Sequence, residues 1–324
     1  MTRLSDLALR HATLLIFVAV LLWFGLQVPG FLTPESLANI VKQSAFIGIA
    51  AIGITFVLLT AGIDLSVGSV MYLAPLIAGF AMRDAGVGVA GGLAVAVLAG
   101  ALLGAINAAA IVGLRIIPFI VTLATLFVFR GFGAFLTSST QFDFEADMRA
   151  FGQASLGPVP MPIVVFALLA VAAWITLSRT TFGRQVYAVG NDPEAARKAG
   201  LPVAAIQARV YVISGACAGL AGFVVISQIG RLDAGFGEGR EFDVIAAAVL
   251  GGASLFGGIG SALGAVVGAT LIQTVKSGLV FTGVNLYLQP ILMAAIIFLA
   301  VLVDSLRARR LNQLKRRTIR PIEA

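Results

Sequence analysis

The chain has 324 residues, of which 59% are hydrophobic and only 11% are charged. A soluble domain carries about 25% charged residues, so these are too few to cover a globular surface of this size. The apolar residues form long runs without the period-two alternation of barrel strands, which excludes a membrane β-barrel. The sequence therefore predicts an all-α, polytopic helical membrane protein, because a helix pairs its backbone polar groups internally.

The basic excess of the chain lies at its C-terminal end. The net charge is +7, and seven Lys and Arg residues fall within 307–320. A basic tail after a last span is typical of the cytoplasmic side of a membrane, so nucleic acid is not expected as a partner. Because the chain has a single cysteine and a single histidine, a metal cluster of these residues is excluded, and no cofactor is expected.

Hydropathy predicts about ten spans within one transmembrane domain, 1–324, with both termini in the cytoplasm. This orientation places fifteen of the 22 Lys and Arg residues in internal segments and five in external loops. The remaining two, Arg130 and Lys276, fall within spans and receive no substrate role. The predicted spans are 12–29, 44–60, 67–82, 87–112, 117–137, 161–178, 207–229, 242–256, 259–280 and 286–303.

The first span, 12–29, follows Arg3 and Arg10, and basic residues before an apolar run also occur in secretory signals. The run is long, however, and 26–31 offers no small-x-small cleavage site. We therefore expect a retained membrane span.

Two glycine-rich clusters, AGIDLSVGS (61–69) and VLGGASLFGGIGS (249–261), interrupt helices at or near membrane depth. The short segments beside them, 67–82 and 242–256, either span the membrane or form re-entrant or broken helices. Transporters tolerate such breaks where the unwound backbone lines a cavity. The candidates for the translocation path are Asp64, Ser66, Gly68, Asn107 and Asp243.

Asp64 has two possible roles. An acid in or beside a span is a functional candidate by default. Alternatively, its carboxylate caps the following helix through the amide of Ser66 or Val67. A cap that shapes a pore-lining helix would satisfy both interpretations.

The glycines spaced by four residues are typical of close helix packing in lipid. They are Gly100 and Gly104, Gly215 and Gly219, and Gly260, Gly264 and Gly268. The predicted external loops 137–160 and 230–243 are rich in acidic residues. These loops are either ordinary solvated segments or a docking face for an external protein.

The longest internal loop, 179–206, contains the polar stretch GNDPEAARKAG (190–200). It predicts a short helix that Asn191 or Asp192 caps, that Pro193 begins and that Gly200 ends. Its small residues, Ala195, Ala196 and Ala199, are expected to allow close contact with a partner. An ordinary loop helix is the alternative.

Several motifs are absent from the sequence. It has no P-loop, since none of its four lysines follows a glycine, and it has no nucleophile elbow or HExxH motif. An enzyme is therefore not expected. Energy for transport must come from an ion gradient or from another subunit, and the spans offer almost no acids or histidines for a proton relay.

The chain resembles the permease subunit of bacterial sugar-uptake ABC transporters of the ribose-permease type. The resemblance covers roughly 35–303 and rests on four motifs that occur in the order of the family. The motifs are IDLSVGS (63–69), NAAAIVGLRIIPFIVTLATLFVFRG (107–131), GRQVYAVGNDPEAARKAGLPV (183–203) and EFDVIAAAVLGGASLFGGIGSALGAVVGA (241–269). Ala61 and Ile117 depart from the common pattern and leave the local shape of the pore open.

The resemblance implies a multi-pass protein of the bacterial inner membrane that works by alternating access. The short cytoplasmic helix would sit in a groove of the ABC ATPase subunit, because Glu194-Ala195-Ala196 and Gly200 look like the EAA…G loop of ABC importers. The ATPase-coupling residues would be Asn191, Asp192, Pro193, Glu194, Ala195, Ala196, Arg197 and Gly200. The other implied partners are membrane lipid, a periplasmic sugar-binding protein and a second permease copy or homologue. The pore is expected to be nearly featureless.

Three alternatives stay open. A branched-chain amino-acid permease of the same superfamily is the nearest one, although IDLSVGS favours a sugar. A gradient-driven secondary transporter would show inverted repeats with intramembrane ionisable groups, and a membrane enzyme would need a catalytic set. The sequence shows neither feature.

Overall fold

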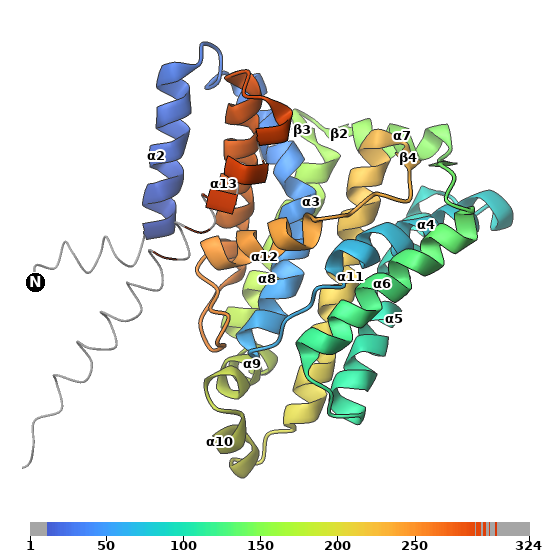
Figure 1. Ribbon diagram of the computed structural model, residues 1–324, viewed down its shortest axis with the longest axis vertical. Coiled ribbons are helices and arrows are strands. Elements are labelled where there is room, and N and C mark those ends of the chain that lie inside the picture. Colours follow the sequence, from blue (N-terminus) through green and yellow to red (C-terminus); the bar gives the residue numbers. More distant parts are fainter. Residues whose placement is uncertain (1–11, 289, 293, 296–297, 299–301, 303–324) are drawn as a thin grey trace, which may run out of the picture.

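A computed structural model describes residues 12–288, 290–292, 294, 295, 298 and 302. Over this part of the chain the protein is a bundle of helices joined by short loops (Figure 1). The α-helices are α2 (Ala12–Gln27), α3 (Pro34–Leu59), α4 (Val67–Ala85), α5 (Val89–Ala108), α6 (Pro118–Thr137), α7 (Ala146–Gln153), α8 (Met161–Arg179), α9 (Thr181–Asn191), α10 (Pro193–Lys198), α11 (Val203–Ile229), α12 (Arg240–Leu250) and α13 (Ala262–Phe281).

Shorter elements complete the described chain. A π-helix, η1 (Ala109–Gly113), ends α5, and a 3₁₀ turn, η2 (Leu286–Leu288), follows α13. Two pairs of short antiparallel strands join loops. They are β1 (Phe142–Asp143) with β4 (Arg231–Leu232), and β2 (Ser155–Leu156) with β3 (Val159–Pro160).

The two longest helices, α3 and α11, form the centre of the bundle. Over their most apolar 18-residue windows, 83% of α3 and 78% of α11 is buried, against 28% for α5 (with η1), α6 and α8. The exposed residues of these outer helices are mostly large and apolar, such as Leu98, Phe127, Phe135 and Leu168. This pattern fits a protein whose surface contacts lipid rather than water.

Glycines allow α5 and α11 to approach at backbone distance. A Cβ atom on Gly100 would overlap the carbonyl oxygen of Gly215, and one on Gly215 would overlap that of Gly100. Gly104 lies in the same way against the backbone of Tyr211, and Gly219 lies against that of Ala96. The predicted use of these four-residue spacings in helix packing is confirmed.

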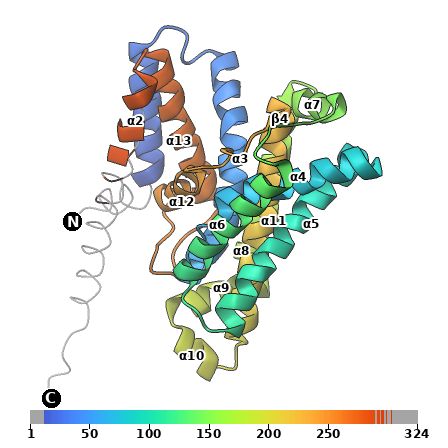
Figure 2. The ribbon, with the colours of Figure 1, turned by 45° about the vertical axis from the view of Figure 1, so that its right-hand side comes forward.

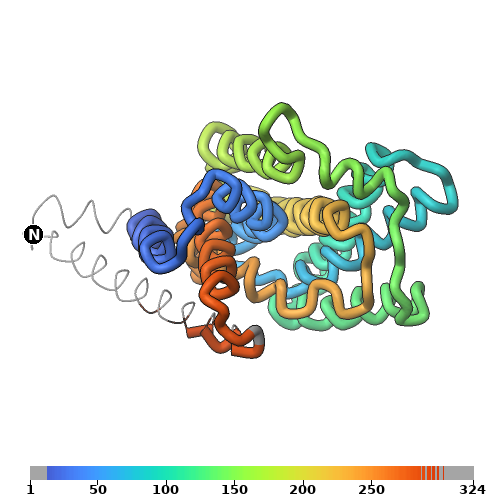
Figure 3. The backbone as a smooth tube through the Cα atoms, turned by 90° about the horizontal axis from the view of Figure 1, so that it is seen from above, coloured from blue at the N-terminus to red at the C-terminus, as the bar shows by residue number. Residues whose placement is uncertain are grey.

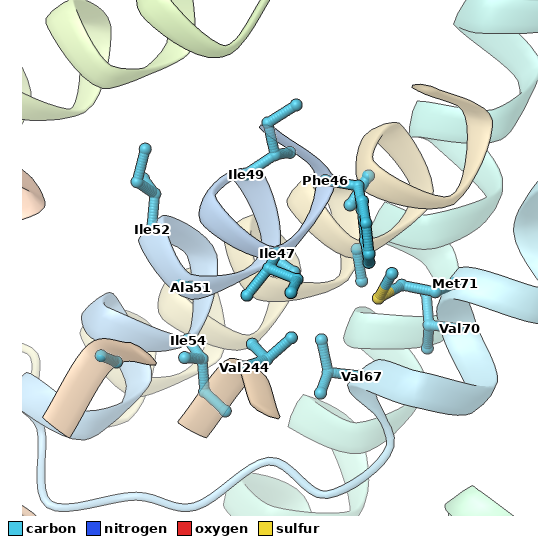
Figure 4. Packing of buried hydrophobic residues seen from close by; sticks show 14 of the residues in the cluster. Phe46, Ile47, Ile49, Ala51, Ile52, Ile54, Val67, Val70, Met71 and Val244 are labelled. Carbon is cyan, nitrogen blue, oxygen red and sulfur yellow. The ribbon is translucent and has the colours of Figure 1, made fainter. Parts of the chain in front are cut away.

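Apolar side chains of α3, α4 and α12 meet beside this contact. Ile54 of α3, Val67 of α4 and Val244 of α12 lie within one cluster, and Val67 and Val244 are almost fully buried (Figure 4). The start of α4 and the short helix α12 therefore share apolar contacts with α3, although most of α4 packs on α5, α11 and α6, and α12 also packs on α13.

Six described helices are long and apolar enough to cross a membrane: α3, α5 with η1, α6, α8, α11 and α13. The helical membrane fold is confirmed, whereas the count of about ten spans stays a prediction. The segment 67–82 forms a continuous helix, α4, with Pro75 inside it. The last predicted span, 286–303, is described only in part, and the basic tail, 304–324, lies wholly outside the described residues.

The predicted bounds of two spans are wrong. The helix at 242–256 is α12, whose 11 residues run from Arg240 to Leu250 and extend about 16 Å, too short to cross a core about 30 Å thick, so the re-entrant or broken-helix alternative is supported here. The glycines that follow end the helix at Leu250, because Gly252 adopts a positive φ of 92°. The segment 44–60 is only part of α3, which begins at Pro34, so Lys42 lies in a helix and not in a loop.

The helix α10 and the strand-bearing loops lie at opposite ends of the bundle (Figures 1 and 2). The sequence placed these segments on opposite sides of the membrane. The loops 137–160 and 230–243, which the sequence predicts to be external, are joined, because β1 pairs with β4 in the register Phe142↔Leu232 and Asp143↔Arg231. At the edge of the bundle, α2 packs against α13, and Figure 3 shows both on one side.

Candidate functional site

The helix α10 has a complete cap at its N-terminus. The Oδ1 atom of Asp192 accepts hydrogen bonds from the amides of Glu194 and Ala195, both at 2.9 Å. Pro193 occupies the first helical position, where its missing N–H costs nothing. Of the two predicted caps, Asp192 is therefore the one used, and the side chain of Asn191 instead donates to the carbonyl oxygen of Tyr187 at 2.9 Å.

Gly200 ends α10 as the sequence predicts. It has a φ of +81°, and its amide donates to the carbonyl oxygen of Arg197 at 3.0 Å. The amide of Leu201 donates to the carbonyl oxygen of Ala196, also at 3.0 Å. These two bonds form a Schellman motif, which fixes the direction of the chain after the helix.

The segment 191–200, which contains α10, is exposed at every position except one. Asn191, Asp192, Pro193, Glu194, Ala195, Arg197, Lys198, Ala199 and Gly200 are all exposed. Ala196 is buried, so the expectation that it offers a contact surface together with Ala195 and Ala199 is wrong. Its side chain packs α10 onto its own chain because it faces inward along the 3.6-residue period.

The neighbouring helix α9 is packed tightly against two other segments. Gly190 has no room for a side chain, because a Cβ atom would overlap the carbonyl oxygen of Leu59 at the end of α3. The amide of Gly258 donates to the same oxygen at 2.9 Å. The hydroxyl of Tyr187 donates to the carbonyl oxygen of Gly260 at 2.8 Å, and partial burial raises the pKa of this phenol above its usual range.

We call this contact of Leu59, Tyr187, Gly190, Gly258 and Gly260 the coupling junction. It brings the polar stretch 190–200 together with the glycine-rich turn that follows α12. It also includes the last residue of α3, directly before the break that leads into α4. Helix α9 is therefore in close backbone contact with the end of α3 and with the turn after α12, and tight packing of this kind leaves little free space between the segments.

Asp64 lies at the centre of a buried polar network. Its Oδ1 accepts from the amide of Ser66 at 3.0 Å and from the hydroxyl of Ser66 at 2.6 Å. Its Oδ2 accepts from the hydroxyl of Ser214 on α11 at 2.8 Å. The first of these bonds is the one that the capping interpretation named, but it closes a turn before the helix: Ser66 is the N-cap of α4, and no described side chain caps that helix.

The network continues to two further helices. The side-chain amide of Asn107 donates to the hydroxyl of Ser66 at 2.8 Å, and Thr125 donates to the Oδ1 of Asn107 at 2.7 Å. Asp64, Ser66, Asn107 and Ser214 are each 0–1% exposed, and each of their side chains has a partner. The network thus ties the break before α4 to α5, α6 and α11. That the substrate passes Asp64, Ser66 or Asn107 stays a prediction.

The other two path candidates lie elsewhere. A Cβ atom on Gly68 would overlap the Oε2 of Glu241 and would lie 2.7 Å from the carbonyl oxygen of Gly237, so this glycine lets α4 meet the start of α12. Asp243 pairs with Lys276 at the wall of a cavity of about 480 Å³, which the segment after α11 also lines. This ion pair supplies the partner that Lys276 needs within its predicted span.

Sequence reasoning missed the contacts that form the coupling junction. Leu59 and Tyr187 carry no signal of their own, whereas the paired glycines 257 and 258 both require positive φ angles, of 86° and 72°. The contact between the carboxylate of Glu241 and Gly68 was also missed, although Glu241 is only 6% exposed. Arg130 was noted as a span residue in need of a partner, and it donates to the carbonyl oxygen of Phe236 at 3.3 Å.

Comparison with known proteins places this geometry in a family. Residues 36–301 match the model of the branched-chain amino acid transport system / permease component family. The chain belongs to this family. The match covers α3 to α13 and thus includes the coupling junction and the polar network. No solved structure matches the chain.

Curated relatives of the chain carry the names of sugar permeases. It is 38% identical to the ribose import permease protein RbsC of Escherichia coli K12 over 86% of this chain and 88% of that protein. It is 36% identical to RbsC of Bacillus subtilis 168, over 85% and 86%. The D-allose transport system permease protein AlsC of E. coli K12 is 33% identical, over 92% of each chain. The predicted resemblance to ABC sugar permeases and the inner-membrane location are confirmed.

Proposed function

We propose that the chain is the transmembrane subunit of an ATP-driven importer that moves a monosaccharide or related polyol by alternating access. The coupling junction is the observation that carries this proposal. It joins an exposed, capped cytoplasmic helix to the two breaks of the membrane helices through contacts of Leu59, Gly190 and Gly258. A secondary transporter has no need of such a link, because its driving ion binds within the membrane.

The exposed residues of α10 form the surface offered to an ABC ATPase. They include Glu194 and Lys198, which form an ion pair at 3.3 Å on the solvent side. Because the cap, Pro193 and Gly200 hold α10 in one shape, little conformational entropy is lost when the partner binds. At the opposite end of the bundle, the loops joined by β1 and β4 form one face for a periplasmic binding protein.

We further propose an N-in, C-in orientation and a complex with a second permease copy or homologue. The positive-inside rule supports the orientation, since α10 lies among the basic internal loops. ATP is hydrolysed in the ATPase subunit, because the chain has no P-loop of its own.

The substrate class follows from the relatives. Relatives at 33–38% identity are named for ribose and D-allose, and this similarity favours a sugar. The name of the family keeps a branched-chain amino acid as the second candidate. A competition assay separates the two: excess D-ribose, D-allose or D-galactose should compete with the transported solute, and excess leucine should not.

The test is reconstitution in proteoliposomes with the ATPase and the binding protein. We expect ATP-dependent uptake of labelled sugar, no uptake without the ATPase, and no ATP hydrolysis by the permease alone. Uptake that survives removal of the ATPase but collapses with a proton ionophore would overturn the proposal.

A further inference from the structure

Three buried polar atoms gather where α4, α6 and α12 meet. Among the described residues, only four fully buried side-chain polar atoms lack a hydrogen-bond partner. Three of them are the phenolic oxygen of Tyr72, the Nη2 of Arg130 and the Oε2 of Glu241. Buried polar groups in native proteins are almost always paired, so three unpaired groups in one region call for an occupant.

The packing shows that these three residues are neighbours. The Oε2 of Glu241 lies against Gly68, which is one helical turn before Tyr72 on α4. The ring of Tyr72 in turn lies against Gly133 on α6. Arg130 precedes Gly133 by three residues and therefore projects from the same face of α6. Gly68 of α4 thus makes room for the carboxylate of Glu241 on α12, and Gly133 of α6 makes room for the ring of Tyr72 on α4.

Only one terminal nitrogen of the Arg130 guanidinium, Nη1, has partners among the described residues, whereas Nη2 has none. Its Nη1 donates to the carbonyl oxygen of Phe236 at 3.3 Å and lies 3.5 Å from the Oε1 of Glu238. Glu238 is largely exposed, whereas the side chain of Arg130 is 14% exposed. The structure shows no ion pair between Arg130 and Glu241 in the described part of the chain, although a buried acid of this kind normally has a cationic partner.

A cavity adjoins the same segment. Its volume is about 480 Å³, within the range of about 300–1,000 Å³ that is usual for small-molecule sites. Its lining includes Phe236, Gly237 and Glu238, which also contact Arg130 or Gly68, so the cavity lies beside Tyr72, Arg130 and Glu241, although none of these three is in its lining. The remaining charged residues of its lining are Arg231, Asp233, Arg240, Asp243 and Lys276.

We propose that Tyr72, Arg130 and Glu241 form a recognition site for the hydroxyl groups of the transported sugar, beside this cavity. Each sugar hydroxyl both donates and accepts hydrogen bonds. A guanidinium donor, a carboxylate acceptor and a phenol that does both provide the matching set. This inference rests on the proposed function and differs from the expectation of a nearly featureless pore. The alternative occupant is ordered water, which would satisfy the same atoms without any preference among sugars.

The test compares Tyr72→Phe and Glu241→Gln with the intact permease, each assembled with its ATPase and binding protein. The probes are labelled D-ribose, D-allose and D-galactose, and the readouts are KM, maximal uptake rate and thermal stability. Tyr287→Phe is the matched control, because Tyr287 is 88% exposed and far along the chain from α4. Tyr72→Phe removes an oxygen that has no protein partner, so stability should not fall.

We expect Tyr72→Phe to weaken transport by about threefold to tenfold, the effect of one neutral hydrogen bond. Glu241→Gln should weaken transport by about tenfold or more, because its hydrogen bonds are charge-assisted. Both effects should differ among the three sugars, and Tyr287→Phe should have no effect. Equal effects on all sugars, or no effect from either variant, would show that water fills the site. If the intact complex imports no monosaccharide or polyol in an ATP-dependent manner, the proposed function itself fails, whereas normal sugar uptake that neither variant changes overturns this inference alone.

Discussion

The amide of Gly258 and the carbonyl oxygen of Leu59 are joined by a hydrogen bond of 2.9 Å. This bond links the glycine-rich turn after α12 to the end of α3, two segments almost 200 positions apart in the sequence. Gly190 of α9 packs on the same carbonyl group. One backbone oxygen is therefore shared by the segment that is proposed to receive force from the ATPase and by the two breaks that are proposed to move.

The first prediction concerns Gly190. Gly190→Ala places a methyl group on the carbonyl oxygen of Leu59, so α9 must shift away from the coupling junction. Overpacking of this kind costs about 1–3 kcal/mol. We expect sugar uptake to fall strongly while the ATPase still binds, because α10 itself is unchanged. Uptake and ATPase pull-down are measured together.

The matched control for this change is Gly131→Ala on α6, where the added methyl group meets no neighbouring atom. It should leave uptake and membrane abundance near normal. Normal uptake by Gly190→Ala would show that the junction transmits nothing.

The second prediction concerns the cap of α10. Asp192→Ala removes the acceptor of the amides of Glu194 and Ala195 and should destabilise the helix by about 1 kcal/mol. We expect ATPase binding to weaken several-fold. Asp192→Asn should retain most of the binding, because asparagine caps nearly as well. If Ala and Asn bind the ATPase equally well, the cap has no part in docking.

The third prediction separates the two faces of α10. Ala195→Trp and Ala199→Trp add bulk to exposed positions and should block ATPase binding without lowering membrane abundance. Ala196→Trp adds bulk to a buried position, so it should also disturb packing within the chain. Abundance by immunoblot and ATPase pull-down together distinguish these effects. ATPase binding that survives both exposed substitutions would identify α10 as an ordinary loop helix.

The local rules of sequence predicted α10 almost completely. Asp192, Pro193 and Gly200 act through neighbours within five residues, so their roles can be predicted from the local sequence alone. The same holds for Asp64 and the amide of Ser66. Hydropathy alone does not define where a span ends, and it failed at 242–256, where Leu250 and Gly252 end a short helix before the membrane can be crossed.

Contacts between distant segments were beyond the reach of sequence patterns. Nothing in the spacing of Ser214 indicates that its hydroxyl meets Asp64, 150 positions earlier. The inward turn of Ala196 depends on where α9 and α11 place α10. The four-residue spacing of the glycines predicted that helices would pack closely, but it did not predict which helices would meet. That Gly100 contacts Gly215 is known only from the fold.

The last prediction separates shape from charge at Asp64. The carboxylate accepts three hydrogen bonds, two from Ser66 and one from Ser214. Asparagine keeps the acceptor for Ser66, and its amide can donate to the hydroxyl of Ser214, which then acts as the acceptor. Asp64→Asn should therefore retain much of the transport activity.

Asp64→Leu should abolish most of the transport, because it leaves buried donors of Ser66 and Ser214 unsatisfied at about 1–3 kcal/mol each. Ser214→Ala is the matched control: it removes only the bond to Oδ2 and should have an intermediate effect. Sugar uptake, normalised to membrane abundance, is measured for all three variants. An equal loss in Asp64→Asn and Asp64→Leu would show that the negative charge, and not the shape of the break before α4, is what transport needs.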